Sequence, residues 1–227
     1  MENKVKKSFL YFDIIMALFV AVILISNIAS TKIVSLWKFD FDGGTLLFPL
    51  SYIFGDILVE VYGYKKSKRV IWIGFFSAFL MSAILMIVNA LPPAAGWEFQ
   101  QDFQNILGLT PRIVLASLIA FLAGGFSNSY LMAKLKIKTK GKLLWLRTIS
   151  STIIGEGIDT VLFVFIAFYG ILPNFLLISI FISNYVFKTL LEVILTPVTY
   201  KVIHFLKKKE GEDYYDNKTN FNPCSVK

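Results

Sequence analysis

The sequence predicts an all-α membrane protein with six transmembrane helices and both termini in the cytoplasm. Three observations support this fold class. Of the 227 residues, 56% are hydrophobic and only 17% are charged, and the mean hydropathy is +0.66. Apolar runs long enough to cross a bilayer recur along the whole chain, as in polytopic membrane proteins. Lys and Arg residues gather in alternate connections between these runs, and this pattern sets the predicted orientation.

The apolar runs define one polytopic membrane domain, because no connection is long enough to hold a second domain. The predicted spans are about 9–29, 46–62, 70–91, 113–133, 143–170 and 175–206. The last run exceeds the roughly 20 residues that cross a bilayer, so it tilts, kinks near Pro197 or extends past the membrane. The polar segment 207–227 is expected to be a disordered cytoplasmic tail.

Basic and non-basic connections alternate along the chain. The basic ones are the amino terminus, 63–69, 134–142 and the segment after 206, and the others are 31–45, 94–111 and 171–174. The positive-inside rule places the basic set in the cytoplasm. Each half then has three spans, so the halves are oppositely oriented and an inverted 3+3 arrangement is possible. Gly55-Asp56 and Gly155-Glu156 lie in the middle span of each half.

Composition argues against several other classes of function. The net charge of +8 does not indicate nucleic-acid binding, because the Lys and Arg residues flank membrane spans. One cysteine, Cys224, allows no disulfide and no thiolate metal site within the chain. The single histidine, His204, lies at the end of the last run, where an interfacial role is expected. We therefore predict no metal and no cofactor.

Sequence patterns of known catalytic sites are missing, so an enzyme is not predicted. The chain has no zinc-binding His-Glu-x-x-His helix, no Cys–His pair and no phosphate-binding glycine loop. Ser127 follows Gly124-Gly125-Phe126, a pattern that faintly resembles an intramembrane serine protease, but the only histidine lies at a membrane boundary. A membrane enzyme or assembly factor is the alternative from a different functional class.

The second span carries two carboxyl groups on one helix face. Asp56 and Glu60 are four residues apart, and Tyr52 lies one turn earlier on the same face. An Asp in the middle of a membrane helix costs about 2.5–3.5 kcal/mol on insertion scales. We therefore expect this face to line a polar site inside a helix bundle.

Two other spans carry polar residues at helical spacing. Glu156 and Asp159 share a face of the fifth span, and Asn184, Lys188 and Glu192 share a face of the sixth. Asp56 and Glu156 each lie nine residues from a basic residue at the cytoplasmic boundary, which is roughly 13 Å along a helix. The two carboxyl groups are therefore predicted to lie at a similar depth.

Purely structural roles are the alternative for each stripe. Lys188 and Glu192 can pair with each other, or Lys188 can neutralise an acid on another helix. Asp56 can form an interhelical hydrogen bond, and Glu60 can reach the cytoplasmic interface by snorkelling. Carboxyl groups nevertheless outnumber Lys188 inside the membrane. The excess must be protonated, hydrated or available for a ligand that is cationic or donates hydrogen bonds.

Aromatic residues next to these carboxyl groups favour a flat heterocyclic ligand. Tyr52, Tyr62, Tyr64 and Tyr185 each lie near a polar stripe. A ring can stack on an aromatic side chain while a carboxylate accepts two hydrogen bonds from an amidine-like or guanidine-like edge.

The segment FPLSYIFGDILVEVYGYKKSKR at 48–69 resembles the signature of the queuosine precursor transporter family, earlier described as vitamin uptake transporters. SNIASTKIV at 26–34, GEGIDTVLF at 155–163 and NPC at 222–224 also match, and the resemblance covers nearly the whole chain. Family members tend to close with Asn-Pro-Phe, so Cys224 and the three residues after it depart from the pattern. This departure affects no functional residue.

The resemblance implies a six-helix protein of the bacterial cell membrane, the inner membrane in a Gram-negative cell. It would import 7-cyano-7-deazaguanine or 7-aminomethyl-7-deazaguanine for queuosine salvage in tRNA. The alternative is a substrate-binding subunit of an energy-coupling-factor vitamin transporter, which needs an ATPase partner. A homo-oligomer is also possible. The predicted substrate-binding residues are Asp56, Glu60, Glu156, Asp159, Tyr52, Asn184, Lys188 and Glu192.

Overall fold

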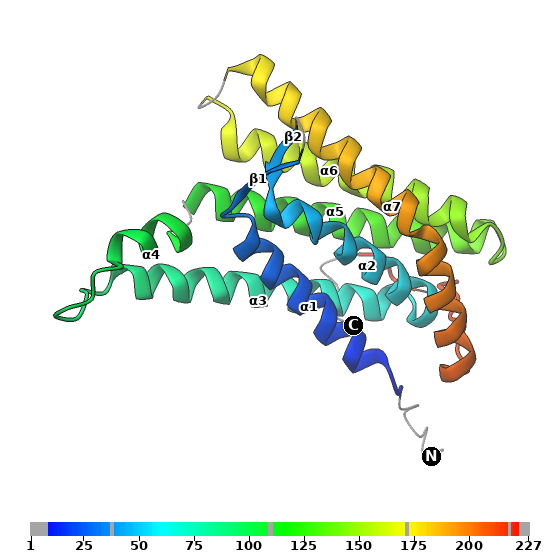
Figure 1. Ribbon diagram of the computed structural model, residues 1–227. Coiled ribbons are helices and arrows are strands. Elements are labelled where there is room, and N and C mark those ends of the chain that lie inside the picture. The colour runs from blue at the N-terminus through cyan, green and yellow to red at the C-terminus, as the bar shows by residue number, and fades with distance from the viewer. Residues whose placement is uncertain (1–8, 37–38, 109–110, 171–172, 218, 223–227) are drawn as a thin grey trace.

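A computed structural model describes residues 9–36, 39–108, 111–170, 173–217 and 219–222 (Figure 1). Six helices in this part of the chain are long and apolar enough to cross a membrane, which confirms the predicted all-α membrane fold. These helices are α1 (Phe12–Ala29), α2 (Phe48–Tyr62), α3 (Tyr64–Ala90), α5 (Pro111–Lys138), α6 (Leu144–Phe168) and α7 (Asn174–Glu210).

Three small elements fill connections in which the sequence predicted no regular structure. Strands β1 (Ile33–Leu36) and β2 (Phe39–Asp42) form an antiparallel hairpin after α1. The 3-10 turn η1 (Gly43–Leu46) follows and leads into α2. Helix α4 (Gln100–Leu107) lies in the loop between α3 and α5. The hairpin and α4 lie away from the lysine-rich end of the bundle, which is on the right in Figure 1.

The connection between α2 and α3 is tighter than the predicted turn at 63–69. The chain reverses at Gly63, whose φ of 87° lies in the region that favours glycine, and α3 begins at Tyr64. Lys65 and Lys68 therefore lie on the first turns of α3. Similarly, α5 extends to Lys138, so the basic loop predicted at 134–142 is in large part helical.

Helix α2 is the central helix of the bundle. It packs against α1, α3, α5 and α7, and α6 packs against α5 and α7. Phe19 and Ile23 of α1 join Ile57 and Val61 of α2 and Ile71 of α3 in one apolar core. Because lipid tails are as apolar as these side chains, close packing supplies most of the attraction between membrane helices. The helix that carries Asp56 and Glu60 is thus shielded from lipid.

Helices α5 and α6 approach closely where two glycines face each other. A Cβ atom at Gly155 would lie 3.1 Å from the carbonyl oxygen of Gly124 and 2.9 Å from Cβ of Asn128. Small residues permit such close backbone contact between membrane helices. The crossing brings the polar face of α6 next to Tyr52 and Asn128.

Helix α7 is the longest helix, with 37 residues. At 1.5 Å per residue it is about 55 Å long, well beyond a hydrocarbon core of about 30 Å. Figure 1 shows that α7 changes direction in its orange-coloured part, where Pro197 lies inside the helix. Proline lacks the backbone N–H and crowds the preceding turn, which bends helices. The predicted kink therefore occurs, and extension of α7 past the membrane stays a prediction.

Candidate functional site

Two polar clusters lie inside the bundle, one above the other along α2. The central cluster consists of Tyr52, Asp56, Asn128, Glu156, Asp159, Lys188 and Glu192. The basic-end cluster consists of Glu60, Lys136, Arg147, Lys207 and Asp213. Asp56 and Glu60 are four positions apart, about one helical turn, and this turn separates the clusters.

Asp56 lies fully buried in the middle of α2. Asn128 of α5 donates a hydrogen bond of 2.7 Å from Nδ2 to Oδ1 of Asp56. The second carboxyl oxygen, Oδ2, has no hydrogen-bond donor among the described residues. Asp56 therefore keeps one oxygen available for a ligand.

Lys188 of α7 joins the two predicted acids of α6. Its Nζ atom donates a hydrogen bond of 3.0 Å to Oδ2 of Asp159 and lies 3.3 Å from Oε2 of Glu156. The contact with Glu156 is an ion pair without hydrogen-bond geometry, so neither oxygen of Glu156 has a hydrogen-bond donor within the described ranges. The ammonium group also lies 4.4 Å from the ring centre of Phe48, a cation–π distance.

Glu192 lies one turn after Lys188 on α7. Its side chain is 1% exposed, and neither carboxyl oxygen has a hydrogen-bond donor in the described part of the chain. It lies within electrostatic range of Asp56 and Glu156. Acids from the three helices α2, α6 and α7 therefore lie within electrostatic range of one another at Glu192.

Tyr52 closes the central cluster toward α5 and α6. Its buried hydroxyl has no hydrogen-bond partner among the residues the structure describes, and it lies within electrostatic range of Asp56, Glu156 and Asp159. The hydroxyl fills the space where Gly124 lacks a side chain. The Tyr52 ring therefore forms an aromatic wall of the cluster, and its hydroxyl makes no hydrogen bond with the described residues.

Asn184 stands apart from these contacts. It is half-buried on α7, one turn before Lys188 and toward the end of the bundle that has few lysines. Nearby, the Tyr185 hydroxyl donates a 3.0 Å hydrogen bond to the carbonyl of Ile153, and its ring stacks on Phe181 at 5.8 Å. Tyr185 therefore ties α7 to α6.

A small cavity of about 10 Å³ lies beside Tyr52 and Asn128, lined also by Phe19, Ile71 and Phe121. That is about the minimum that holds one water molecule, far less than a purine-sized base needs. This cavity is therefore too small in this structure to hold such a base.

The basic-end cluster binds Glu60 from three helices. Arg147 of α6 donates two hydrogen bonds to its carboxylate, at 2.6 and 3.2 Å, and Lys207 of α7 donates one at 2.5 Å. Lys136 of α5 donates to the Glu60 carbonyl at 2.6 Å. Bidentate Arg–carboxylate pairs are among the strongest side-chain contacts. Glu60 thus joins α2 to α6 and α7, the helices that also surround the central cluster.

The segment after α7 packs against the bundle, contrary to the predicted disorder of the tail. Asp213 accepts hydrogen bonds from Lys136 at 2.5 Å, and it pairs with Lys207 at 2.9 Å. Asp216 accepts one from the Tyr64 backbone N–H at 3.0 Å. Partial burial acts to raise the pKa of Asp213, but the hydrogen bonds and charges of the two lysines outweigh it and lower this pKa below the usual value.

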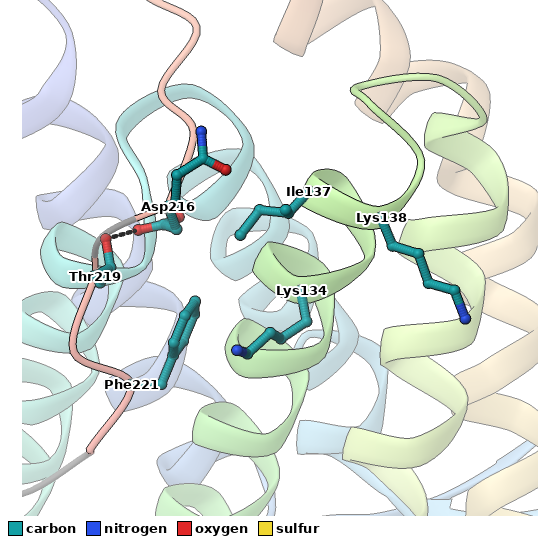
Figure 2. Close-up of a pocket in the computed structure, with 7 residues that line it drawn as sticks. Lys134, Ile137, Lys138, Asp216, Thr219 and Phe221 are labelled. Carbon is teal, nitrogen blue, oxygen red and sulfur yellow. Dashed lines mark hydrogen bonds between the residues drawn. The ribbon is translucent and has the colours of Figure 1, made fainter.

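A larger cavity of about 520 Å³ lies between this tail and the end of α5 (Figure 2). Lys134 and Lys138 line one side, and Asp216 and Phe221 line the other. Figure 2 shows Thr219 bonded to Asp216, an internal contact of 2.7 Å. None of the predicted substrate-binding residues lines this cavity.

The central cluster has the chemistry of a receptor for hydrogen-bond donors and cations. It offers buried carboxyl oxygens and a tyrosine hydroxyl that have no hydrogen-bond partner among the described residues. Within the described ranges, no group of three or more His, Cys, Asp and Glu side chains has the geometry to hold a metal ion. The sequence predicted six of the seven residues of the central cluster but not Asn128, whose amide gave no signal in an apolar run.

Comparisons with known proteins match this chain to transporters. The family model described as "Putative vitamin uptake transporter" matches residues 42–202. A Bacillus subtilis (strain 168) protein named "Probable queuosine precursor transporter" is 30% identical over 176 residues, 77% of each chain. The Escherichia coli (strain K12) "Queuosine precursor transporter" is 26% identical over 185 residues, 80% of this chain and 81% of its own. No solved structure matches.

The matched region contains every residue of the central cluster, from Tyr52 to Glu192. A Haemophilus influenzae (strain ATCC 51907 / DSM 11121 / KW20 / Rd) protein, also named "Probable queuosine precursor transporter", is 26% identical over 163 residues, 70% of this chain and 67% of its own. The chain therefore belongs to the family of transporters whose matched curated members are named for queuosine precursors.

Proposed function

We propose that this chain imports 7-cyano-7-deazaguanine, 7-aminomethyl-7-deazaguanine or both across the bacterial cell membrane, and that the central cluster binds the base. Family membership supports the class of substrate. The observation that carries the site is a set of buried carboxyl oxygens without donors on three adjoining helices, at Asp56, Glu156 and Glu192.

The chemistry of the ligand matches these groups. A deazaguanine presents adjacent N–H donors on its guanine-type edge, and a carboxylate accepts such a pair in parallel. Phe48 and Tyr52 lie next to the acids, with ring centres 6.0 Å apart, and supply apolar faces for the flat ring. Asn128 orients Asp56, and Lys188 holds Asp159 and Glu156 on α6.

Glu60 has a different role in this proposal. Its carboxylate is occupied by Arg147 and Lys207, so it holds the basic end of the bundle closed in this form. Asn184, one turn from Lys188 toward the opposite end, lies on the path by which the base would reach the cluster. Because the acids of α2, α6 and α7 are buried where α7 packs against α2 and α6, we expect α7 to move away from these helices to admit the base.

Uptake by the purified chain in proteoliposomes tests the proposal. Asp56→Asn and Glu156→Gln keep size and burial but remove the carboxylate. Losing a charge-assisted hydrogen bond costs about 1.5–3 kcal/mol, so uptake at low concentrations of labelled precursor should fall at least about tenfold. Glu98→Gln makes the same chemical change at an exposed site outside the cluster and serves as the control.

Normal uptake in either cluster variant would remove that residue from the site. No uptake by the wild-type chain of either precursor would reject the proposed function as a transporter that works alone. Restoration of uptake by an added ATPase complex would then favour the vitamin-transporter subunit. Uptake by the wild-type chain alone excludes the need for that partner.

A further inference from the structure

The central cluster carries more acidic than basic groups. Asp56, Glu156, Asp159 and Glu192 are all buried, and Lys188 is the one cationic side chain of the cluster. Three carboxyl groups are therefore left without a cation inside the cluster. Fully ionised, they would place three uncompensated charges in a region of low dielectric, which is costly.

The neighbouring basic-end cluster compensates only part of this excess. It has three cations, Lys136, Arg147 and Lys207, against two carboxylates, Glu60 and Asp213, so one positive charge is left over. Asp56 lies within electrostatic range of both Arg147 and Glu60, whose opposite charges offset each other there. Two carboxyl groups of the central cluster still lack a counter-charge.

Glu192 is the acid of the central cluster with the fewest contacts that could stabilise a negative charge. Helix α7 packs against α2 and α6, and the charged groups of these helices within electrostatic range of Glu192 are Asp56 and Glu156, both acidic. On its own helix the nearest charge is Lys188, whose ammonium is already bound to Asp159 and Glu156. The Glu192 side chain is 1% exposed, and its carboxyl oxygens have no hydrogen-bond partner in the described part of the chain, so its contact with solvent is limited.

The two forms of the precursor differ in charge, and this difference bears on the imbalance. The aminomethyl form carries a primary amine, which is an ammonium ion at neutral pH, as in lysine. The cyano form is neutral. Only the aminomethyl form can supply the missing positive charge. The excess of acids in the cluster therefore favours this form as the ligand.

We propose that the site prefers the cationic aminomethyl base, and that its ammonium replaces a proton held on Glu192 and its acidic neighbours when the site is empty. On binding, the carboxyl group of Glu192 gives its proton to the solvent and pairs with the ammonium as a carboxylate. The proton is released, and no bond other than O–H breaks. This inference rests on the proposed function, because it refines the substrate of the same site.

Calorimetry on the purified full-length protein tests the exchange. The aminomethyl and cyano bases are titrated at pH 7 in phosphate and in Tris, buffers that differ in ionisation enthalpy. We expect release of about one proton per aminomethyl base bound and none per cyano base. The aminomethyl base should also bind at least about tenfold more tightly, as expected for a buried ion pair worth over 1.4 kcal/mol.

A variant at Glu192 tests whether this residue carries the exchanged proton. In Glu192→Gln the ratio of the two affinities should fall by about tenfold and proton release should disappear, whereas Glu98→Gln should retain both. Binding of the aminomethyl base without proton release, or equal affinity for both bases, would overturn the inference and leave the proposed function standing. Failure of the wild-type protein to bind either base would instead count against the proposed function.

Discussion

Asp56 and Glu60 lie on one face of α2, yet their partners give them different roles. Asp56 accepts a hydrogen bond from a neutral amide and keeps a free oxygen, whereas Glu60 is bound by Arg147 and Lys207. A neutral partner leaves a carboxylate able to bind a ligand, but two cations satisfy it. In the proposed function, one helical turn thus separates a group that binds the base from a group that holds the basic end closed.

Glycine at the crossing of α5 and α6 gives a prediction at the scale of single residues. A Cβ at Gly124 would clash with the Tyr52 hydroxyl and would lie 2.8 Å from Cβ of Asp159, whereas one at Gly125 meets only Ile71 at 3.7 Å. We expect Gly124→Ala to lower the free energy of unfolding by about 1–3 kcal/mol and to impair uptake.

Gly125→Ala is the matched control, because it makes the same substitution one position along the same helix. It should leave stability unchanged or raise it slightly, since alanine favours helix. Thermal unfolding in detergent and uptake in proteoliposomes measure both variants. If Gly124→Ala were as stable and as active as Gly125→Ala, then Tyr52 would not be held against α5 in the way described.

The sequence predicts which residues are polar and buried, but not which of them meet. Helical spacing placed Asp56, Glu156 and Glu192 on inward faces. The partner of Glu60, by contrast, is 87 residues away in Arg147, and that of Asp56 is 72 residues away in Asn128. Spacing along one helix carries no information on contacts between helices, so these pairs could be identified only from the three-dimensional structure.

At the scale of elements, the end of α7 and the tail tie the basic end of the bundle together. Glu210, the last residue of α7, accepts hydrogen bonds from the Tyr11 backbone at 2.7 Å and from the Tyr62 hydroxyl at 2.9 Å. Tyr214 fills the space left open at Gly63. Polar composition predicted a disordered tail, because composition does not reveal that the bundle offers partners for these groups.

Removal of the tail should therefore destabilise the bundle. Deleting 211–227 removes the contacts of Asp213 with Lys136 and Lys207 and the hydrogen bond from the Tyr64 backbone N–H to Asp216. At about 1 kcal/mol for each of these three contacts alone, the midpoint of thermal unfolding should fall by at least roughly 6–12 °C. Deletion of 224–227 alone, which lie outside the described residues, is the control. Equal unfolding temperatures for both deletions would contradict the role given to Asp213.

Acid should weaken the same contacts, and the direction follows from the lowered pKa of Asp213. A carboxyl group whose pKa is lower in the folded state contributes stability above its unfolded value and loses it as pH falls through the folded value. The contacts of Asp213 are thus intact at neutral pH and fail only in acid. Thermal unfolding from pH 7 to pH 3 should show a smaller loss of stability in Asp213→Asn than in the unchanged chain.

At the scale of the whole molecule, the structure has a lysine-rich end and an end with few lysines. The amino-terminal end of α1, Gly63 between α2 and α3, the loop between α5 and α6 and the end of α7 lie together on the right in Figure 1. The alternation of basic and non-basic connections predicted this grouping from sequence, because the order of the spans alone decides which connections lie at the same end of the bundle. The inverted relation between the halves stays a prediction.

The lysine-rich end is predicted to face the cytoplasm, and labelling of single cysteines tests this orientation. In a Cys224→Ser background, Glu98→Cys places a thiol in the exposed loop before α4, and Lys140→Cys places one in the loop between α5 and α6. A membrane-impermeant maleimide applied to intact cells should label Glu98→Cys only, because it cannot reach the cytoplasm. Permeabilised cells should show labelling of both thiols and so control for reactivity. Labelling of Lys140→Cys alone in intact cells would show that the orientation is the opposite one. The basic-end cluster would then close the bundle toward the outside of the cell.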